Sequence, residues 1–125
     1  MAVTAVKAVV NARGGFLEVK DHEEPAKPGH FLAAIPFGQA APCDMWIPWC
    51  NSAEMFLGAH YITIGQQFTQ PTFYWLYQRD EKVMYQELEW WKDAAKRPVP
   101  GYSDVGGDRV LVVNSAGLFL SKVGL

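Results

Sequence analysis

The sequence predicts an all-β domain, either an antiparallel β-sandwich or a small β-barrel, with at most one short helix near residues 86–96. Three observations predict this class. Short runs of β-branched and aromatic residues alternate with turn residues, the 125 residues include 11 Gly and 8 Pro, and only one segment has helical spacing. The length suits a single domain, residues 1–125, with a hydrophobic core of its own.

The strands predicted in the first half of the chain are apolar or alternating runs bounded by Gly, Pro, Asn or Asp. They lie, in order, at 4–11, 16–20, 31–35, 45–49, 54–57 and 61–64. The runs at 45–49 and 54–57 are the least regular of these. The residues at 12–15, 21–29 and 38–42 are predicted to form the turns and loops between the strands.

The strands predicted in the second half are separated by two short turns, at 79–81 and 115–117. They lie at 72–78, 82–86, 109–114 and 118–123. A Val-Val-Asn run followed by a glycine turn occurs near both ends of the chain, at 9–17 and 112–120. Because tight hairpins favour Asn and Gly, this echo predicts a hairpin at each end of the chain, lying close together in the fold.

The helix is predicted in the segment 86–96, which contains no turn residue and is rich in Glu, Leu, Lys and Ala. Leu88, Trp91 and Ala95 fall at helical spacing, and Pro98 would end the helix.

Composition excludes several classes of protein. Hydrophobic residues make up 50% of the chain and charged residues 19%, which excludes disorder over the whole length. The net charge of −2 and the lack of a basic cluster argue against nucleic acid as a partner. No apolar run is long enough for a transmembrane segment, and Lys7 interrupts the apolar start that a signal peptide would need. We therefore expect a cytoplasmic protein, or one secreted without a visible signal peptide.

The two cysteines, Cys43 and Cys50, leave two arrangements open. In one extended strand their Cα atoms would lie about 23 Å apart, whereas a disulfide requires about 7 Å or less. The segment therefore either doubles back, so that a bridge can form, or is extended with both thiols free. We favour free thiols.

The sequence contains no spacing typical of a catalytic, cofactor or metal site. His22 and Glu24 share one side of an extended loop, but they would need His30 or His60 to complete a metal site. We therefore predict no metal and no cofactor, and favour a non-enzymatic protein.

Aromatic residues are the most informative feature, at 14% of the chain with five Trp. Many must replace Leu and Ile in the core. In the strand at 72–78, Phe73, Trp75 and Tyr77 share one face, while Tyr74 and Leu76 share the other. Either this strand is covered on both faces, or one face is an exposed aromatic ridge of the kind that marks a binding surface.

Exposed aromatic rings can stack on sugars while neighbouring polar side chains bond the hydroxyls, so the sequence favours a lectin-like, carbohydrate-binding protein with a glycan or other small ligand as its partner. Gln66, Gln67, Gln70 and Gln78 are nearby polar groups. The predicted ligand-binding residues are Trp46, Trp49, Tyr74, Trp75, Tyr77, Arg79, Asp80, Trp90 and Trp91.

Three alternatives use the same rings differently. The protein could bind membrane lipid, as a small cytolysin does, with the rings at the membrane interface. It could be a small enzyme or carrier with an aromatic pocket. Finally, the aromatic face could be the interface of a homo-oligomer. The polar groups considered for the enzyme are His60, Asp44, Asp80 and Glu87.

Overall fold

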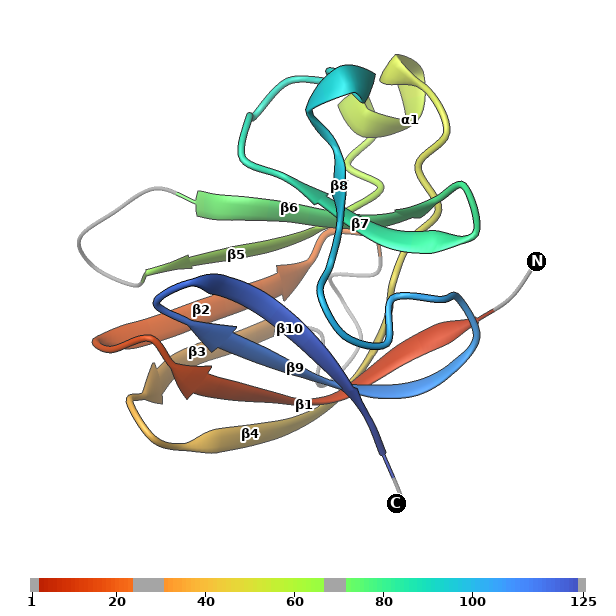
Figure 1. Cartoon of the computed structure of the whole chain (residues 1–125). Coiled ribbons are helices and arrows are strands. Elements are labelled where there is room, and N and C mark those ends of the chain that lie inside the picture. Colours follow the sequence, from red (N-terminus) through yellow and green to blue (C-terminus); the bar gives the residue numbers. More distant parts are fainter. Residues whose placement is uncertain (1–2, 24–30, 67–71, 124–125) are drawn as a thin grey trace.

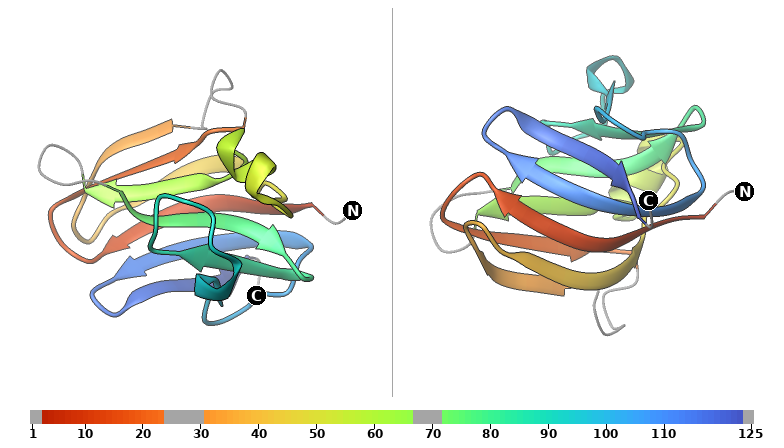
Figure 2. Two further views of the ribbon diagram at one scale, coloured as in Figure 1. Left: turned by 90° about the horizontal axis from the view of Figure 1, so that it is seen from above. Right: turned by 60° about the horizontal axis from the view of Figure 1, so that its bottom comes forward.

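The computed structural model of the chain describes residues 3–23, 31–66 and 72–123. Within these ranges two packed sheets make up almost all of the regular structure, with one short α-helix (Figures 1 and 2). The predicted all-β class is therefore confirmed. Four residues singled out by the sequence lie outside the described residues, namely Glu24, His30, Gln67 and Gln70.

The first sheet has four strands in the spatial order β10-β9-β1-β4. Strand β1 pairs with β9 in parallel, whereas β1–β4 and β9–β10 are antiparallel. Among the strand pairs in the described residues, β1–β9 is thus the parallel one and the others are antiparallel. The strands are β1 (Thr4–Ala12), β4 (Ala40–Trp46), β9 (Gly107–Asn114) and β10 (Gly117–Lys122).

The second sheet has six strands in the order β3-β2-β5-β6-β7-β8, and all of its pairs are antiparallel. Strands β6 and β7 are joined by a tight turn at residues 80–81, which confirms the predicted hairpin. The strands are β2 (Phe16–Asp21), β3 (Phe31–Pro36), β5 (Ile62–Gln66), β6 (Thr72–Arg79), β7 (Lys82–Gln86) and β8 (Arg97–Pro98).

The main hydrophobic core lies between the two sheets. Val9 and Leu111 from the first sheet pack in one cluster with Leu17, Ile64 and Leu76 from the second. All five side chains are fully buried. Along β2 and β9, buried positions alternate with more exposed ones. Because successive side chains of a strand point to opposite faces, this period of two places Leu17 and Leu111 on the inner faces.

The two sheets are also linked at their edges, which gives the sandwich a barrel-like closure. At one edge the Asn11 side chain donates to the Ile35 carbonyl at 2.8 Å. At the other edge the backbone N–H of Leu120 donates to Pro100 O at 2.9 Å. Gly101 makes this second contact possible, because its φ is +97° and a Cβ there would collide with the Leu120 carbonyl oxygen.

The two ends of the chain lie side by side as predicted, but only one of them is a hairpin. Strands β9 and β10 form the predicted C-terminal hairpin. Strands β1 and β2 belong to different sheets, so the predicted N-terminal hairpin is wrong. The Asn11 side-chain oxygen accepts hydrogen bonds from the N–H groups of Arg13 and Gly14. The turn built in this way carries the chain from one sheet to the other.

The segment between β3 and β5 differs most from the prediction. Strand β4 occupies residues 40–46, and its first three residues, 40–42, fall in the predicted loop at 38–42. Residues 54–57 are helical and not extended, within α1 (Ala53–Leu57). The Ser52 hydroxyl caps this helix by accepting a hydrogen bond from the N–H of Met55 at 3.2 Å.

The helix predicted near 86–96 is reduced to a single 3₁₀ turn, Asp93–Ala95. The residues before this turn do not form a helix, because the buried Gln86 amide donates to the carbonyl oxygens of Leu88 and Trp90. A helix would require those oxygens for its own hydrogen bonds. The segment instead runs across the outer face of the six-stranded sheet (Figure 1).

Both cysteines are free thiols, as the sequence favoured. Cys50 is fully buried and Cys43 is half-buried. Burial raises the pKa of each thiol to about 11. Both side chains are therefore protonated at neutral pH and poorly suited to act as nucleophiles.

Candidate functional site

A second hydrophobic cluster lies on the outer face of the six-stranded sheet. Trp75 and Tyr77 point outward from β6 and pack with Met84 of β7 and the buried Cys50. Phe56 belongs to the same cluster, and its helix α1 lies above the six-stranded sheet in Figure 1. Strand β6 is thus covered on both faces. Of the two arrangements that its aromatic residues allowed, it is the covered strand and not the exposed aromatic ridge.

Three predicted ligand-binding residues of β6 are core residues. Tyr74 packs between the sheets, with 7% of its surface exposed. Trp75 and Tyr77 belong to the outer cluster, with 9% and 0% exposed. A ring buried to this extent stabilises the fold and does not present a face for stacking.

Arg79 and Asp80, also predicted to bind ligand, attach the segment after Trp91 to the β6–β7 hairpin. The Arg79 Nε donates to the Asp93 carboxylate at 2.7 Å, and its guanidinium lies 5.2 Å from the centre of the Trp91 ring. The Asp80 carboxylate forms an ion pair with Lys96 at 3.4 Å. These contacts give both residues a structural role.

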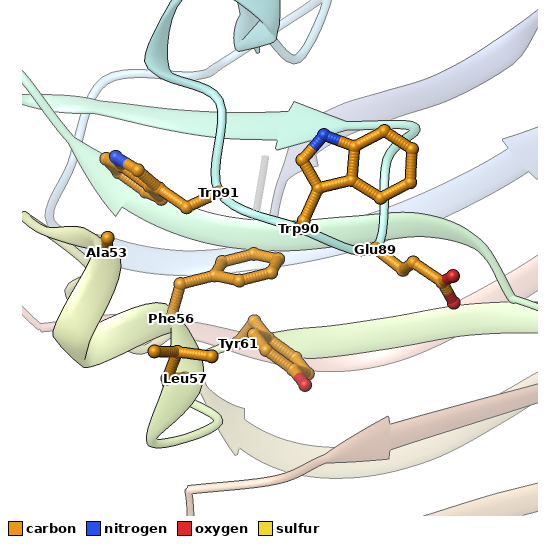
Figure 3. A pocket seen from close by; sticks show the side chains of 7 residues that line it. All are labelled: Ala53, Phe56, Leu57, Tyr61, Glu89, Trp90 and Trp91. Carbon is orange, nitrogen blue, oxygen red and sulfur yellow. The ribbon is translucent and has the colours of Figure 1, made fainter.

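A pocket of about 360 Å³ opens beside the outer cluster (Figure 3). One wall is α1, and the opposite wall is the loop that follows β7. Its volume falls in the range of roughly 300–1,000 Å³ that is usual for small-ligand sites. The residues that line it are Ala53, Phe56, Leu57, Tyr61, Glu89, Trp90 and Trp91.

The inner wall of the pocket is continuous with the buried cluster and is fixed by ring contacts. The Phe56 ring lies 4.8 Å from Tyr61 and 5.9 Å from Trp91, measured between ring centres. Trp91 in turn lies 5.8 Å from Tyr77. The outer wall is open to solvent, because Trp90 is 58% and Leu57 is 86% exposed.

Two residues with polar side chains also line the pocket. Glu89 contributes a carboxylate, which can only accept hydrogen bonds when ionised, and Tyr61 contributes a hydroxyl. Burial raises the pKa of Tyr61, so its hydroxyl remains a neutral donor at physiological pH. The pocket thus offers an apolar platform together with one acidic acceptor and one donor.

The structure brings together two of the predicted ligand-binding residues, Trp90 and Trp91. Trp46 is 48% exposed but belongs to β4 in the other sheet. Trp49 is half-buried and pairs with Gln78 through a parallel bridge. Five lining residues were not predicted, and three of them lie on α1. The N-cap residue Ser52 is the sequence signal from which this helix could have been predicted. They are Ala53, Phe56, Leu57, Tyr61 and Glu89.

Gln86 holds the loop that carries Glu89 and Trp90. It is 1% exposed, and its side-chain oxygen accepts a hydrogen bond from the Tyr77 hydroxyl at 2.8 Å. Its amide group donates to the carbonyl oxygens of Leu88 at 2.8 Å and Trp90 at 2.7 Å. One buried side chain therefore connects the core to the outer wall of the pocket, and no local sequence pattern marks it.

Replacing Gln86 with Leu is expected to release this loop. The change leaves two loop carbonyls and the Tyr77 hydroxyl without their partner, at a cost of about 1–3 kcal/mol of unfolding free energy. Denaturant titration measures this cost, and indole N–H signals of Trp90 and Trp91 in NMR spectra should shift or broaden. Gln39→Leu, at an exposed position, is the matched control. Unchanged indole signals in Gln86→Leu would contradict the positioning role.

Three of the four polar groups considered for catalysis lie in separate pairs, namely His60, Asp44 and Asp80. His60 Nδ1 lies 2.6 Å from the Glu23 carboxylate, and Lys7 donates to Asp44 at 2.7 Å. His22 bonds Thr63 at 2.7 Å, and desolvation lowers its pKa. Within the described ranges, no three His, Cys, Asp or Glu side chains are grouped so that they could hold a metal ion.

No known protein family matches this chain, and neither does any curated protein or solved structure. In the part of the chain that the structure describes, no helix has the length and apolar character needed to cross a membrane.

Proposed function

We propose that this protein binds a carbohydrate in the aromatic pocket between α1 and the loop that follows β7, without converting it. The observation that carries this proposal is Trp90, a large ring that is 58% exposed at the mouth of a pocket lined by further rings. An apolar ring left in water is unfavourable, and the apolar face of a pyranose is a suitable cover for it.

The remaining pocket residues suit the other parts of a sugar. The Glu89 carboxylate can accept hydrogen bonds from hydroxyl groups, and the Tyr61 hydroxyl can donate to a ring or glycosidic oxygen. The rings of Phe56 and Trp91 provide a fixed inner wall. Small-ligand sites are usually lined by apolar side chains with a few polar groups among them, and this pocket has that composition.

Binding without turnover is favoured by the positions of the acid–base candidates. His60 is paired with Glu23, and Asp80 with Lys96. Neither His60 nor Asp80 lines the pocket, whose titratable lining groups are Glu89 and Tyr61. General acid–base chemistry needs positioned groups that converge on the reacting atoms.

The proposal is tested by calorimetric titration of the protein with neutral and amine-bearing monosaccharides and their oligomers. We expect at least one of them to bind saturably at micromolar to millimolar concentration. Trp90→Ala should weaken that binding about tenfold or more, since stacking contributes on the order of 1 kcal/mol or more per ring. The same titration should shift the indole N–H signals of Trp90 and Trp91 in NMR spectra.

Trp46→Ala provides the matched control, because Trp46 is similarly exposed but lies on the other sheet. Its removal should leave the affinity unchanged. The proposal fails if no sugar binds at millimolar concentration, or if Trp46→Ala weakens binding as much as Trp90→Ala does.

A further inference from the structure

One acidic residue, Glu89, is among the residues that line the aromatic pocket. Glu87 precedes it in the same loop, and Glu54 lies on α1. In the described part of the chain none of these three carboxylates forms an ion pair. The unpaired cation nearest to Glu89 in sequence is Lys92. Among the residues that line the pocket, the charged side chain is therefore the Glu89 carboxylate.

The one arginine close to the pocket does not neutralise this charge. Arg79 is bonded to the Asp93 carboxylate and to the carbonyl oxygen of Asn51, each at 2.7 Å. It is not among the residues that line the pocket. Its guanidinium already lies 5.2 Å from the Trp91 ring centre, which shows that this ring accepts a cation as a neighbour.

Four aromatic rings and one carboxylate are the groups that attract an organic cation. The face of an aromatic ring carries partial negative charge, and a cation within about 6 Å of its centre is attracted to it. A neutral sugar that covered Glu89 would replace the hydrogen bonds of water with those of its hydroxyl groups, but it would leave the carboxylate charge unpaired. An ammonium group would both pair with Glu89 and lie against the rings.

We propose that the ligand is a saccharide with a free, protonated amino group, such as a hexosamine unit that is not acetylated. This inference rests on the proposed carbohydrate-binding function and names the class of sugar. The sugar face stacks on Trp90, and the ammonium group pairs with Glu89 inside the aromatic wall. Acetylation would remove the positive charge and with it this pair.

The experiment compares glucosamine, N-acetylglucosamine and glucose by calorimetric titration at pH 6 and low ionic strength, where the free amine is protonated. We expect glucosamine to bind about tenfold more tightly than either neutral sugar. In Glu89→Gln this preference should fall to about twofold or less. Glu87→Gln is the matched control and should keep most of it. Raising the salt concentration should weaken the binding of glucosamine more than that of glucose.

The outcomes separate the two proposals. Equal affinity for the three sugars would overturn the amino-sugar inference and leave carbohydrate binding standing. A preference that survives in Glu89→Gln would also overturn it. If tetramethylammonium binds as tightly as glucosamine while neither neutral sugar binds, the site recognises organic cations in general, and carbohydrate binding fails as well.

Discussion

Replacing Tyr77 with Ala is expected to lower the free energy of unfolding by about 3–5 kcal/mol, the usual cost of removing a buried aromatic side chain. Tyr77 is fully buried in the outer cluster, where its ring lies 6.3 Å from Phe56 and 5.8 Å from Trp91. Its hydroxyl also donates to Gln86. The change therefore removes the support of both walls of the pocket, and ligand binding should be lost together with stability.

Two further variants separate packing from hydrogen bonding. Tyr77→Phe keeps the ring and removes only the hydroxyl, so it should cost about 1–2 kcal/mol. Phe37→Ala removes a ring that is 63% exposed and should change stability by about 0.5 kcal/mol or less. All three are measured by denaturant titration. If Tyr77→Ala were no more harmful than Phe37→Ala, the outer cluster would not contribute to folding.

The second large effect is expected at Gln78, which is 1% exposed and joins the two sheets. Its side-chain oxygen accepts a hydrogen bond from the Thr4 hydroxyl of β1 at 2.7 Å. Its amide group donates to the Ile47 carbonyl at 2.5 Å. Gln78→Leu leaves the Thr4 hydroxyl without its acceptor and the Ile47 carbonyl without this donor, so we expect a loss of about 2–3 kcal/mol of unfolding free energy.

A double-mutant cycle with Thr4→Val tests whether these groups act together. The Thr4 hydroxyl also accepts from the Gly106 N–H at 2.6 Å, so Thr4→Val alone should cost about 1–3 kcal/mol. The double variant should lose less unfolding free energy than the two single variants together, by about 1 kcal/mol or more. Strict additivity, measured by denaturant titration, would show that Thr4 and Gln78 are not energetically coupled.

Strands with strong alternation could be predicted from the sequence alone. The strands at 72–78 and 82–86 recur as β6 and β7, because β-branched and aromatic residues between turn residues leave the backbone few other options. The C-terminal hairpin follows for the same reason. The sequence does not indicate which sheet a strand joins. Strands β1 and β2 are joined by a glycine turn but belong to different sheets, because such a turn permits both a hairpin and a passage between sheets.

The helix and the pocket were harder to predict because individual side-chain hydrogen bonds and burial decide them. Leu88, Trp91 and Ala95 have helical spacing, but the Gln86 amide captures the backbone oxygens that a helix would need. Ser52, in contrast, begins a real helix in a segment with some β character. Of the aromatic residues predicted to bind ligand, Trp90 and Trp91 line the pocket. Burial on both faces of β6 removes Tyr74, Trp75 and Tyr77 from solvent.

The parallel pairing of β1 with β9 has a consequence for the order of folding. Thr4 is aligned with Gly107, and Ala12 with Asn114, so each contact closes a loop of about a hundred residues. Contacts of such high sequence separation form slowly, because the entropy of loop closure is lost before they contribute. During synthesis, β1 can pair with β4 early, but its other edge stays open until β9 has been made. An unpaired strand edge is prone to wrong pairings, which makes β1 the segment most in need of protection in the nascent chain.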